Sequence, residues 1–219
     1  MIRIVSLCAA FLLLLSSTAS GQEWIEYANR SDLFAVNFPA QPKIETITWI
    51  SESETKYPGH VYSYDEGRNH YAITVVDYSD AERLNAERAK TCPPGAQSAC
   101  SGSITMGVGS WIVDVQGAMA YAIAKFMARE GATITHFGWF YQDLVEGLQT
   151  QITNADGSRT FAATHMHTNR LYVIEATVPR GAPQPGHFQQ SLQFLDADGN
   201  KVRYETVYSN RYPVPRRSR

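Results

Sequence analysis

The 219-residue sequence is short of cysteine, of long apolar runs and of excess charge of either sign. Its longest largely apolar run without a charged residue, residues 4–15, covers about 12 residues, fewer than the roughly 20 that a membrane-spanning helix needs. Nineteen basic and 21 acidic residues give a formal net charge of −2, so nothing in the composition indicates binding to nucleic acid or to an anionic membrane. With 44% hydrophobic and 18% charged residues, the composition is that of a globular protein.

The sequence also lacks the short motifs that identify common enzyme classes. It has no G-x-S-x-G nucleophile elbow, no glycine motif that cradles phosphate and no H-E-x-x-H zinc motif. We therefore assign no catalytic residue and no cofactor. A hydrolase whose site has no recognisable spacing is the alternative from another functional class.

The N-terminal residues have the layout of a secretory signal peptide. Arg3 supplies a positive charge, residues 4–15 are apolar, and small polar residues follow up to Gly21. Cys8 lies inside the apolar run, whereas a lipid-anchored protein would carry its cysteine at the end of that run. We predict cleavage after Gly21 and a soluble mature chain that is periplasmic or secreted, the alternative being an uncleaved anchor.

Cleavage would leave two cysteines, Cys92 and Cys100, in the segment TCPPGAQSACSG. Two lone cysteines usually pair in an oxidising compartment, which predicts a disulfide. Closing this loop would remove about 2.6 kcal/mol of unfolded-chain entropy. A redox role would favour the shorter C-x-x-C spacing, and a structural zinc site would need four ligands. Those two roles and free thiols are the alternatives.

Apolar periodicity predicts an α+β fold, with alternating segments for strands and a helical period for helices. Strands are expected over residues 33–39, 43–50, 56–66, 69–79 and 132–141, with two or three antiparallel strands between 145 and 179 around a turn at Asp156-Gly157, and a candidate last strand over 200–208. Helices are expected over residues 80–90, 110–130 and 185–195. The segment 111–115 could also be a strand. We expect a single domain over residues 22–208.

This order of elements resembles the PsbP-like α/β/α sandwich family, which includes many exported bacterial proteins. The resemblance covers roughly residues 24–195 and lies in the order of elements and in four segments, FAVNFP (34–39), YAITVVD (71–77), RLYVI (170–174) and the segment 188–194, together with the long central helix. It implies a central antiparallel sheet with helices on both faces and a non-enzymatic binding or assembly role. It transfers no catalytic residue.

The histidines of the segment THMHTN are the strongest candidate for metal chemistry. In a strand, His165 and His167 project from one face and Met166 from the other. Two such imidazoles can bind zinc or copper(II), but a metal site needs a third ligand that only the fold could supply. The candidates for it are His60, His70, His136 and His187. The alternative is a pair of polar residues on the solvated face of a strand.

The segment HFGWFYQD concentrates aromatic residues on a predicted strand. If one face of the sheet is open to solvent, Trp139 and Tyr141 would line a binding surface. If helices cover both faces, Phe137, Trp139, Phe140 and Tyr141 are all core, and the sandwich architecture favours this interpretation. The sequence does not identify a partner, which we expect to be a protein or a small molecule in the periplasm.

The C-terminal residues 209–219 carry the only asymmetry of charge. Their arginines, Arg211, Arg216, Arg217 and Arg219, surround two prolines. This composition is typical of an extended, exposed segment. We expect a solvated tail, with docking to a partner as the alternative.

Overall fold

The computed structural model describes residues 23–93, 110–210 and 217, so the predicted signal peptide, Cys100 and most of the basic tail lie outside the described residues. Seven antiparallel strands form the large sheet: β3 (Lys43–Ile50), β4 (Lys56–Glu66), β5 (Asn69–Asp77), β6 (Thr133–Gln142), β7 (Val145–Thr153), β8 (Arg159–His167) and β9 (Arg170–Val178). Their order is β3-β4-β5-β9-β8-β7-β6. A small sheet has the order β1-β2-β10, formed by β1 (Ile25–Asn29), β2 (Phe34–Phe38) and β10 (Gln193–Phe194).

Tight turns connect neighbouring strands of the large sheet. Asp143-Leu144 joins β6 to β7 and Thr168-Asn169 joins β8 to β9, and all four residues have positive φ. Two consecutive positive φ values define a type I′ turn, whose twist matches that of the flanking strands. Asp and Asn tolerate this conformation better than most residues do. These turns pair β6 with β7 and β8 with β9, and the antiparallel strands predicted between residues 145 and 179 are β7, β8 and β9.

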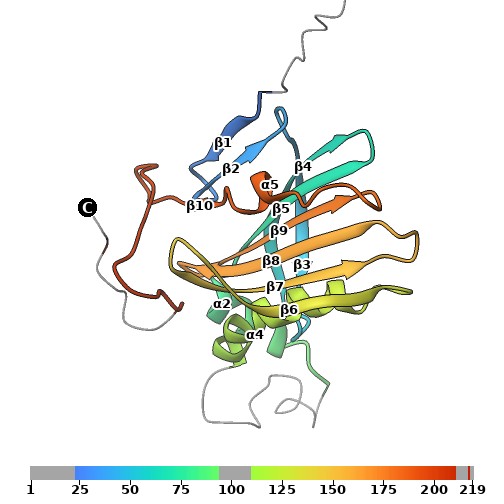
Figure 1. Ribbon diagram of the computed structural model, residues 1–219. Coiled ribbons are helices and arrows are strands. Elements are labelled where there is room, and N and C mark those ends of the chain that lie inside the picture. The colour runs from blue at the N-terminus through green and yellow to red at the C-terminus, as the bar shows by residue number, and fades with distance from the viewer. Residues whose placement is uncertain (1–22, 94–109, 211–216, 218–219) are drawn as a thin grey trace, which may run out of the picture.

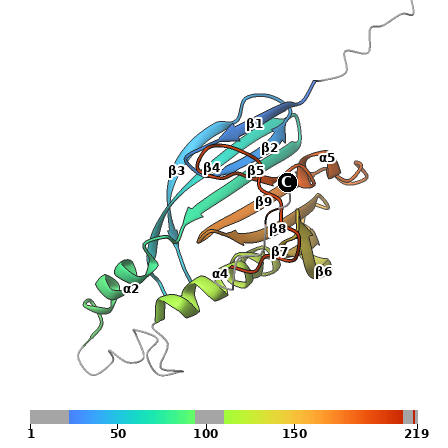
Figure 2. The same ribbon diagram turned by 90° about the vertical axis from the view of Figure 1, so that its left-hand side faces the viewer.

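The large sheet lies between two layers of other elements (Figures 1 and 2), and a separate hydrophobic core forms on each of its faces. Strands β8 and β9 are buried on both faces, so alternate residues belong to different cores. On one face Tyr172 and Ile174 pack with the small sheet and with residues 200–210, which we call the C-terminal segment. On the other face Leu171 and Val173 pack against helix α4 (Ser110–Met127). A strand that is buried on both faces needs consecutive apolar residues. This explains why the residues of the segment RLYVI do not alternate between apolar and polar.

Helix α4 confirms the predicted long helix, and the strand alternative for residues 111–115 is wrong. The predicted apolar stripe of α4 faces the sheet: Trp111, Val115, Met119, Ala122 and Phe126. Its spacing of three and four residues places these side chains on one face of the helix. None of the helices in the described ranges is both long and apolar enough to cross a bilayer.

A buried carboxylate joins α4 to α2 (Ala81–Ala89) and to the start of β4. One oxygen of Asp114, Oδ2, accepts hydrogen bonds from Ser51 Oγ at 2.9 Å, Tyr57 Oη at 2.7 Å and Asn85 Nδ2 at 3.4 Å. Burial, followed by the hydrogen bond to Asp114, raises the pKa of the Tyr57 phenol. The phenol therefore stays protonated and donates to the carboxylate, which stabilises the contact between the two helices.

The two faces of the large sheet are covered differently, which corrects the expected sandwich. The central antiparallel sheet is confirmed, but among the described elements α2 and α4 lie on one face, and the small sheet and one short helix, α5 (Gly186–Gln189), lie on the other (Figure 1). The helix predicted over residues 185–195 is shorter because Phe194 pairs with Phe34 in the small sheet. Residues 200–208 form isolated bridges, such as Val145 with Tyr208, and not the expected strand.

Candidate binding site at the edge of the large sheet

His165 and His167 lie on the same face of β8, as predicted, but they are fully buried. The expectation that they face solvent is wrong because the C-terminal segment and β10 cover this face of the sheet. The Phe194 ring lies between them, with centroid distances of 5.8 Å to His165 and 4.8 Å to His167. The two imidazoles are therefore part of an aromatic core.

Each buried imidazole makes polar contact through one of its two ring nitrogens. Nε2 of His167 lies 2.7 Å from the Tyr204 hydroxyl, and Nδ1 of His165 lies 3.3 Å from the Glu146 carbonyl oxygen. The second ring nitrogens, His165 Nε2 and His167 Nδ1, are buried and have no hydrogen-bond partner in the described part of the chain. Desolvation lowers the pKa of both residues to about 4, so both are neutral at pH 7.

The described residues do not assemble the third ligand that the metal hypothesis requires. No group of three histidine, cysteine, aspartate or glutamate side chains capable of holding a metal ion is found in the described ranges. The four other histidines each have a different contact: His60 with Asp32, His70 with Asp65, His136 with Gln149 and His187 with Trp24. We therefore do not take the metal hypothesis further.

The predicted disulfide is not tested by the described residues. Cys92 is buried just after α2, and Cys100 lies outside the described ranges. The pairing of these two cysteines stays a prediction.

Strand β6 forms one end of the large sheet, and its outer edge has no strand partner among the described residues. This strand, TITHFGWFYQ, contains no proline, lysine, arginine, aspartate or glutamate over ten residues. Natural proteins usually protect a long edge strand with such residues, because unpaired backbone groups recruit other strands. The opposite edge strand, β3, carries Lys43 and Glu45. The two edges of the sheet are therefore not equivalent.

One face of β6 presents three aromatic side chains to solvent. Phe137 is 52% exposed, Trp139 62% and Tyr141 49%. Phe140 points the other way and packs against the core beside His165. The expectation that all four are core is wrong, because α4 packs over β7, β8 and β9 but not over the edge strand. The alternative interpretation, in which Trp139 and Tyr141 lie on an accessible surface, fits the geometry.

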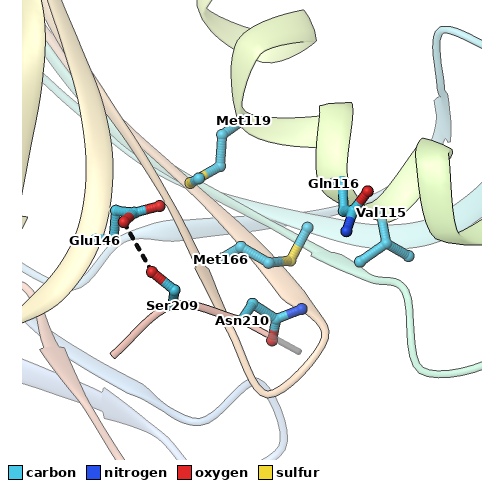
Figure 3. Close-up of a pocket in the computed structure, with 7 residues that line it drawn as sticks. All are labelled: Val115, Gln116, Met119, Glu146, Met166, Ser209 and Asn210. Carbon is cyan, nitrogen blue, oxygen red and sulfur yellow. Dashed lines mark hydrogen bonds between the residues drawn. The ribbon is translucent and has the colours of Figure 1, made fainter. Parts of the chain in front are cut away.

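A pocket of about 260 Å³ opens beside this aromatic face, between α4 and the start of β7 (Figure 3). Tyr141 and Glu146 are cross-strand partners, so their side chains lie on the same face of the sheet. Residues from four segments line the pocket: Val115, Gln116 and Met119 from α4, Glu146 from β7, Met166 from β8, and Ser209 and Asn210 from the C-terminal segment.

Hydrogen bonds hold the polar groups of the pocket in place. The Ser209 hydroxyl donates to Glu146 Oε2 at 2.7 Å. The Asn210 amide donates to Asn169 Oδ1 at 2.9 Å, and Asn210 Oδ1 accepts from the Asn169 backbone N–H at 3.0 Å. The C-terminal segment itself is bound to β7 through the Tyr208 backbone, which accepts from Glu146 N at 3.0 Å. The polar lining is therefore preorganised.

The sequence did not point to Glu146, Ser209 or Asn210. Ser209 and Asn210 fall inside the predicted tail, and 63 positions separate Ser209 from Glu146. No motif connects them, and the only local signal is a lone glutamate at the start of a predicted strand. Such a glutamate is normally solvated, so sequence alone gave no reason to select it.

Comparison with known proteins adds a likeness of fold. No protein-family model matches this sequence, and no curated protein matches it significantly. Among solved structures, the chain is similar to the solution structure of cyanobacterial PsbP (CyanoP) from Synechocystis sp. PCC 6803. The sequence identity is 8%, the match covers 74% of this chain and 84% of that chain, and the TM-score is 0.38. The likeness to a PsbP-like protein that the sequence suggested is thus also found between structures, and we base no functional argument on it.

Proposed function

We propose that this protein is an exported, non-enzymatic binding module that takes up an extended polypeptide segment as an additional strand on the outer edge of β6. The observation that carries the proposal is a ten-residue edge strand without lysine, arginine, aspartate or glutamate, which has no strand partner among the described residues and presents three exposed aromatic side chains on one face. Main-chain hydrogen bonds along such an edge supply affinity, and contacts at alternate side chains supply specificity.

Aromatic rings on an exposed strand suit this role. Phe137, Trp139 and Tyr141 occupy alternate positions, so neighbouring rings are about 7 Å apart along the strand. A strand that pairs with β6 would place its own alternate side chains opposite these rings. Tryptophan and tyrosine are also the residue types that contribute most to binding energy at protein interfaces.

A second copy of this chain is a poorer occupant than a different polypeptide. In a β6–β6 pair, the partner strand would offer no lysine or arginine to the Glu146 carboxylate in the adjacent pocket. An acidic group in a pocket attracts a basic side chain of the ligand. The charge of the pocket thus favours a segment from another protein.

Replacing Trp139 with lysine is expected to abolish strand addition while leaving the fold intact, because the side chain is mostly exposed. The probe is a phage-displayed library of random octapeptides selected on the wild-type protein. Selected peptides should protect β6 amides from hydrogen exchange, and Trp139→Lys should weaken their binding at least tenfold.

The matched control is Ile44→Lys, which introduces the same charge on the opposite edge strand at a side chain of similar exposure. It should bind the selected peptides as the wild type does. Peptides that bind equally well to Trp139→Lys, or that protect β3 instead of β6, would overturn the proposal, as would the failure of the library to yield a binder.

Export and the disulfide are tested together by the intact mass of the protein isolated from its own type of cell. We expect a chain that begins at residue 22 and is two hydrogens lighter than the fully reduced form, because Cys92 and Cys100 pair after export. Reduction should restore the two hydrogens. A full-length mass, or a mature chain with both thiols free, would contradict this part of the proposal.

A further inference from the structure

We propose that the pocket beside Tyr141 binds a primary alkylammonium group, such as the side chain of a lysine in the segment that pairs with β6. This inference rests on the proposed function for the origin of the lysine, but not for the chemistry of the pocket. The argument uses the charge of Glu146, the number of its oxygens that remain available and the apolar walls around it.

Glu146 supplies the charge of the pocket. Among the described residues no cationic side chain lies within ion-pair distance of it, while eight pairs of lysine or arginine with a carboxylate form elsewhere in the described parts of the protein. A carboxylate that is held rigidly at the wall of a pocket without a counter-charge favours a cationic ligand. The other polar lining groups, Gln116 and Asn210, are neutral.

One oxygen of the Glu146 carboxylate accepts a hydrogen bond from Ser209, and the other accepts none from the described residues. Oε2 accepts the Ser209 hydroxyl at 2.7 Å, and Figure 3 shows the second oxygen directed away from Ser209, toward the side of the pocket where Met119 lies. A guanidinium binds carboxylates best through two parallel hydrogen bonds, which need both oxygens. An ammonium is a compact charge that needs only one. Because Ser209 already occupies one acceptor site on Oε2, an ammonium on the other oxygen needs no rearrangement, whereas a two-bond guanidinium would share Oε2 with Ser209.

The remaining walls suit the aliphatic stem of such a side chain. Met119, Met166 and Val115 are apolar, and thioether side chains adapt to unbranched ligands. The charge of Glu146 and the apolar walls thus point to one ligand class, an ammonium on an unbranched chain.

The experiment uses the whole protein with ¹³C-labelled methionine methyl groups and n-butylammonium chloride as the probe, at constant ionic strength. Met119 and Met166 line the pocket, whereas Met127 does not and serves as the internal reference. We expect saturable shifts of the Met119 and Met166 signals and none for Met127. Butan-1-ol, which has the same stem without the charge, should bind at least tenfold more weakly than n-butylammonium. The affinity for n-propylguanidinium should also be lower than that for n-butylammonium.

Glu146→Gln tests the charge, since glutamine keeps an acceptor for Ser209. The substitution should lower the affinity for n-butylammonium at least tenfold. Glu82→Gln, at an exposed position of α2, should leave that affinity unchanged. Equal affinity for butan-1-ol, or unchanged affinity in Glu146→Gln, would overturn the inference.

The source of the ammonium is decided by the selected octapeptides. If octapeptides selected on the wild type carry lysine at one fixed position, and those selected on Glu146→Gln do not, the pocket binds a lysine of the bound segment. If n-butylammonium binds but no peptide protects β6, the pocket binds a free amine and only the strand proposal fails. If peptides protect β6 and neither they nor n-butylammonium shift the Met119 and Met166 signals, the pocket inference fails and the strand proposal stands.

Discussion

Replacing Gly147 with alanine is expected to destabilise the protein by about 3 kcal/mol or more, one of the largest single-residue effects in this fold. Gly147 lies opposite His165 in the pairing of β7 with β8. A Cβ atom there would overlap the His165 ring and the Thr164 carbonyl oxygen. Neither can move away, because the ring is packed in the aromatic core and the carbonyl belongs to the central sheet.

Thermal or urea unfolding measures this effect, and Gly186→Ala is the matched control. A Cβ atom at Gly186 would meet nothing within 4 Å, so that variant should differ from the wild type by less than about 1 kcal/mol. If Gly147→Ala were as stable as Gly186→Ala, the close approach of the two strands around His165 would be contradicted. Because Gly147 follows Glu146, a partly folded Gly147→Ala variant should also lose the pocket.

Acidification from pH 6.5 to pH 4 is expected to remove up to about 3 kcal/mol of stability for each of His165 and His167. The pKa of both is lowered to about 4, mainly by burial, and for His167 the charges of Arg217 and Arg170 contribute to that lowering. As the pH falls, the two imidazoles therefore take up protons at about pH 6.5 in the unfolded chain but only near pH 4 in the folded chain. Stability is fully present above about pH 6.5 and is lost as the pH falls toward 4. Two such losses approach the whole stability of a typical domain.

Urea unfolding as a function of pH tests this expectation. His165→Leu should remove about half of the loss, and its stability at pH 7 should be little changed because it deletes a buried nitrogen that has no partner among the described residues. His136→Gln, at an exposed position, should leave the dependence on pH as in the wild type. A stability that does not change between pH 6.5 and pH 4 would show that the two imidazoles are not buried as neutral groups.

Local patterns determined most of the strands and the central helix. The strict alternation of KIETITWI led to the strand Lys43–Ile50 with both ends correct. The apolar stripe from Trp111 to Phe126 predicted the long helix, although periodicity left residues 111–115 open between a helix and a strand, and only the structure decided for the helix. These predictions succeed because backbone geometry sets which side chains share a face, whatever the rest of the protein does.

The basic tail shows where local patterns stop being sufficient. Composition placed Ser209 and Asn210 in an exposed segment, but hydrogen bonds to Glu146 and Asn169 hold both residues against the sheet. These partners lie at least 41 positions away in sequence. A short polar segment carries no periodicity from which such long-range contacts can be predicted.

By itself, the sequence determined which side chains share a face: His165 with His167, and Trp139 with Tyr141, each pair two positions apart on a strand. Only the tertiary structure decided what covers each face. The C-terminal segment and β10 bury the histidines, while α4 stops short of β6 and leaves the aromatic residues exposed. The reason is physical: alternation is a property of the backbone, whereas burial depends on which distant segment packs on top, and that is set by the whole chain.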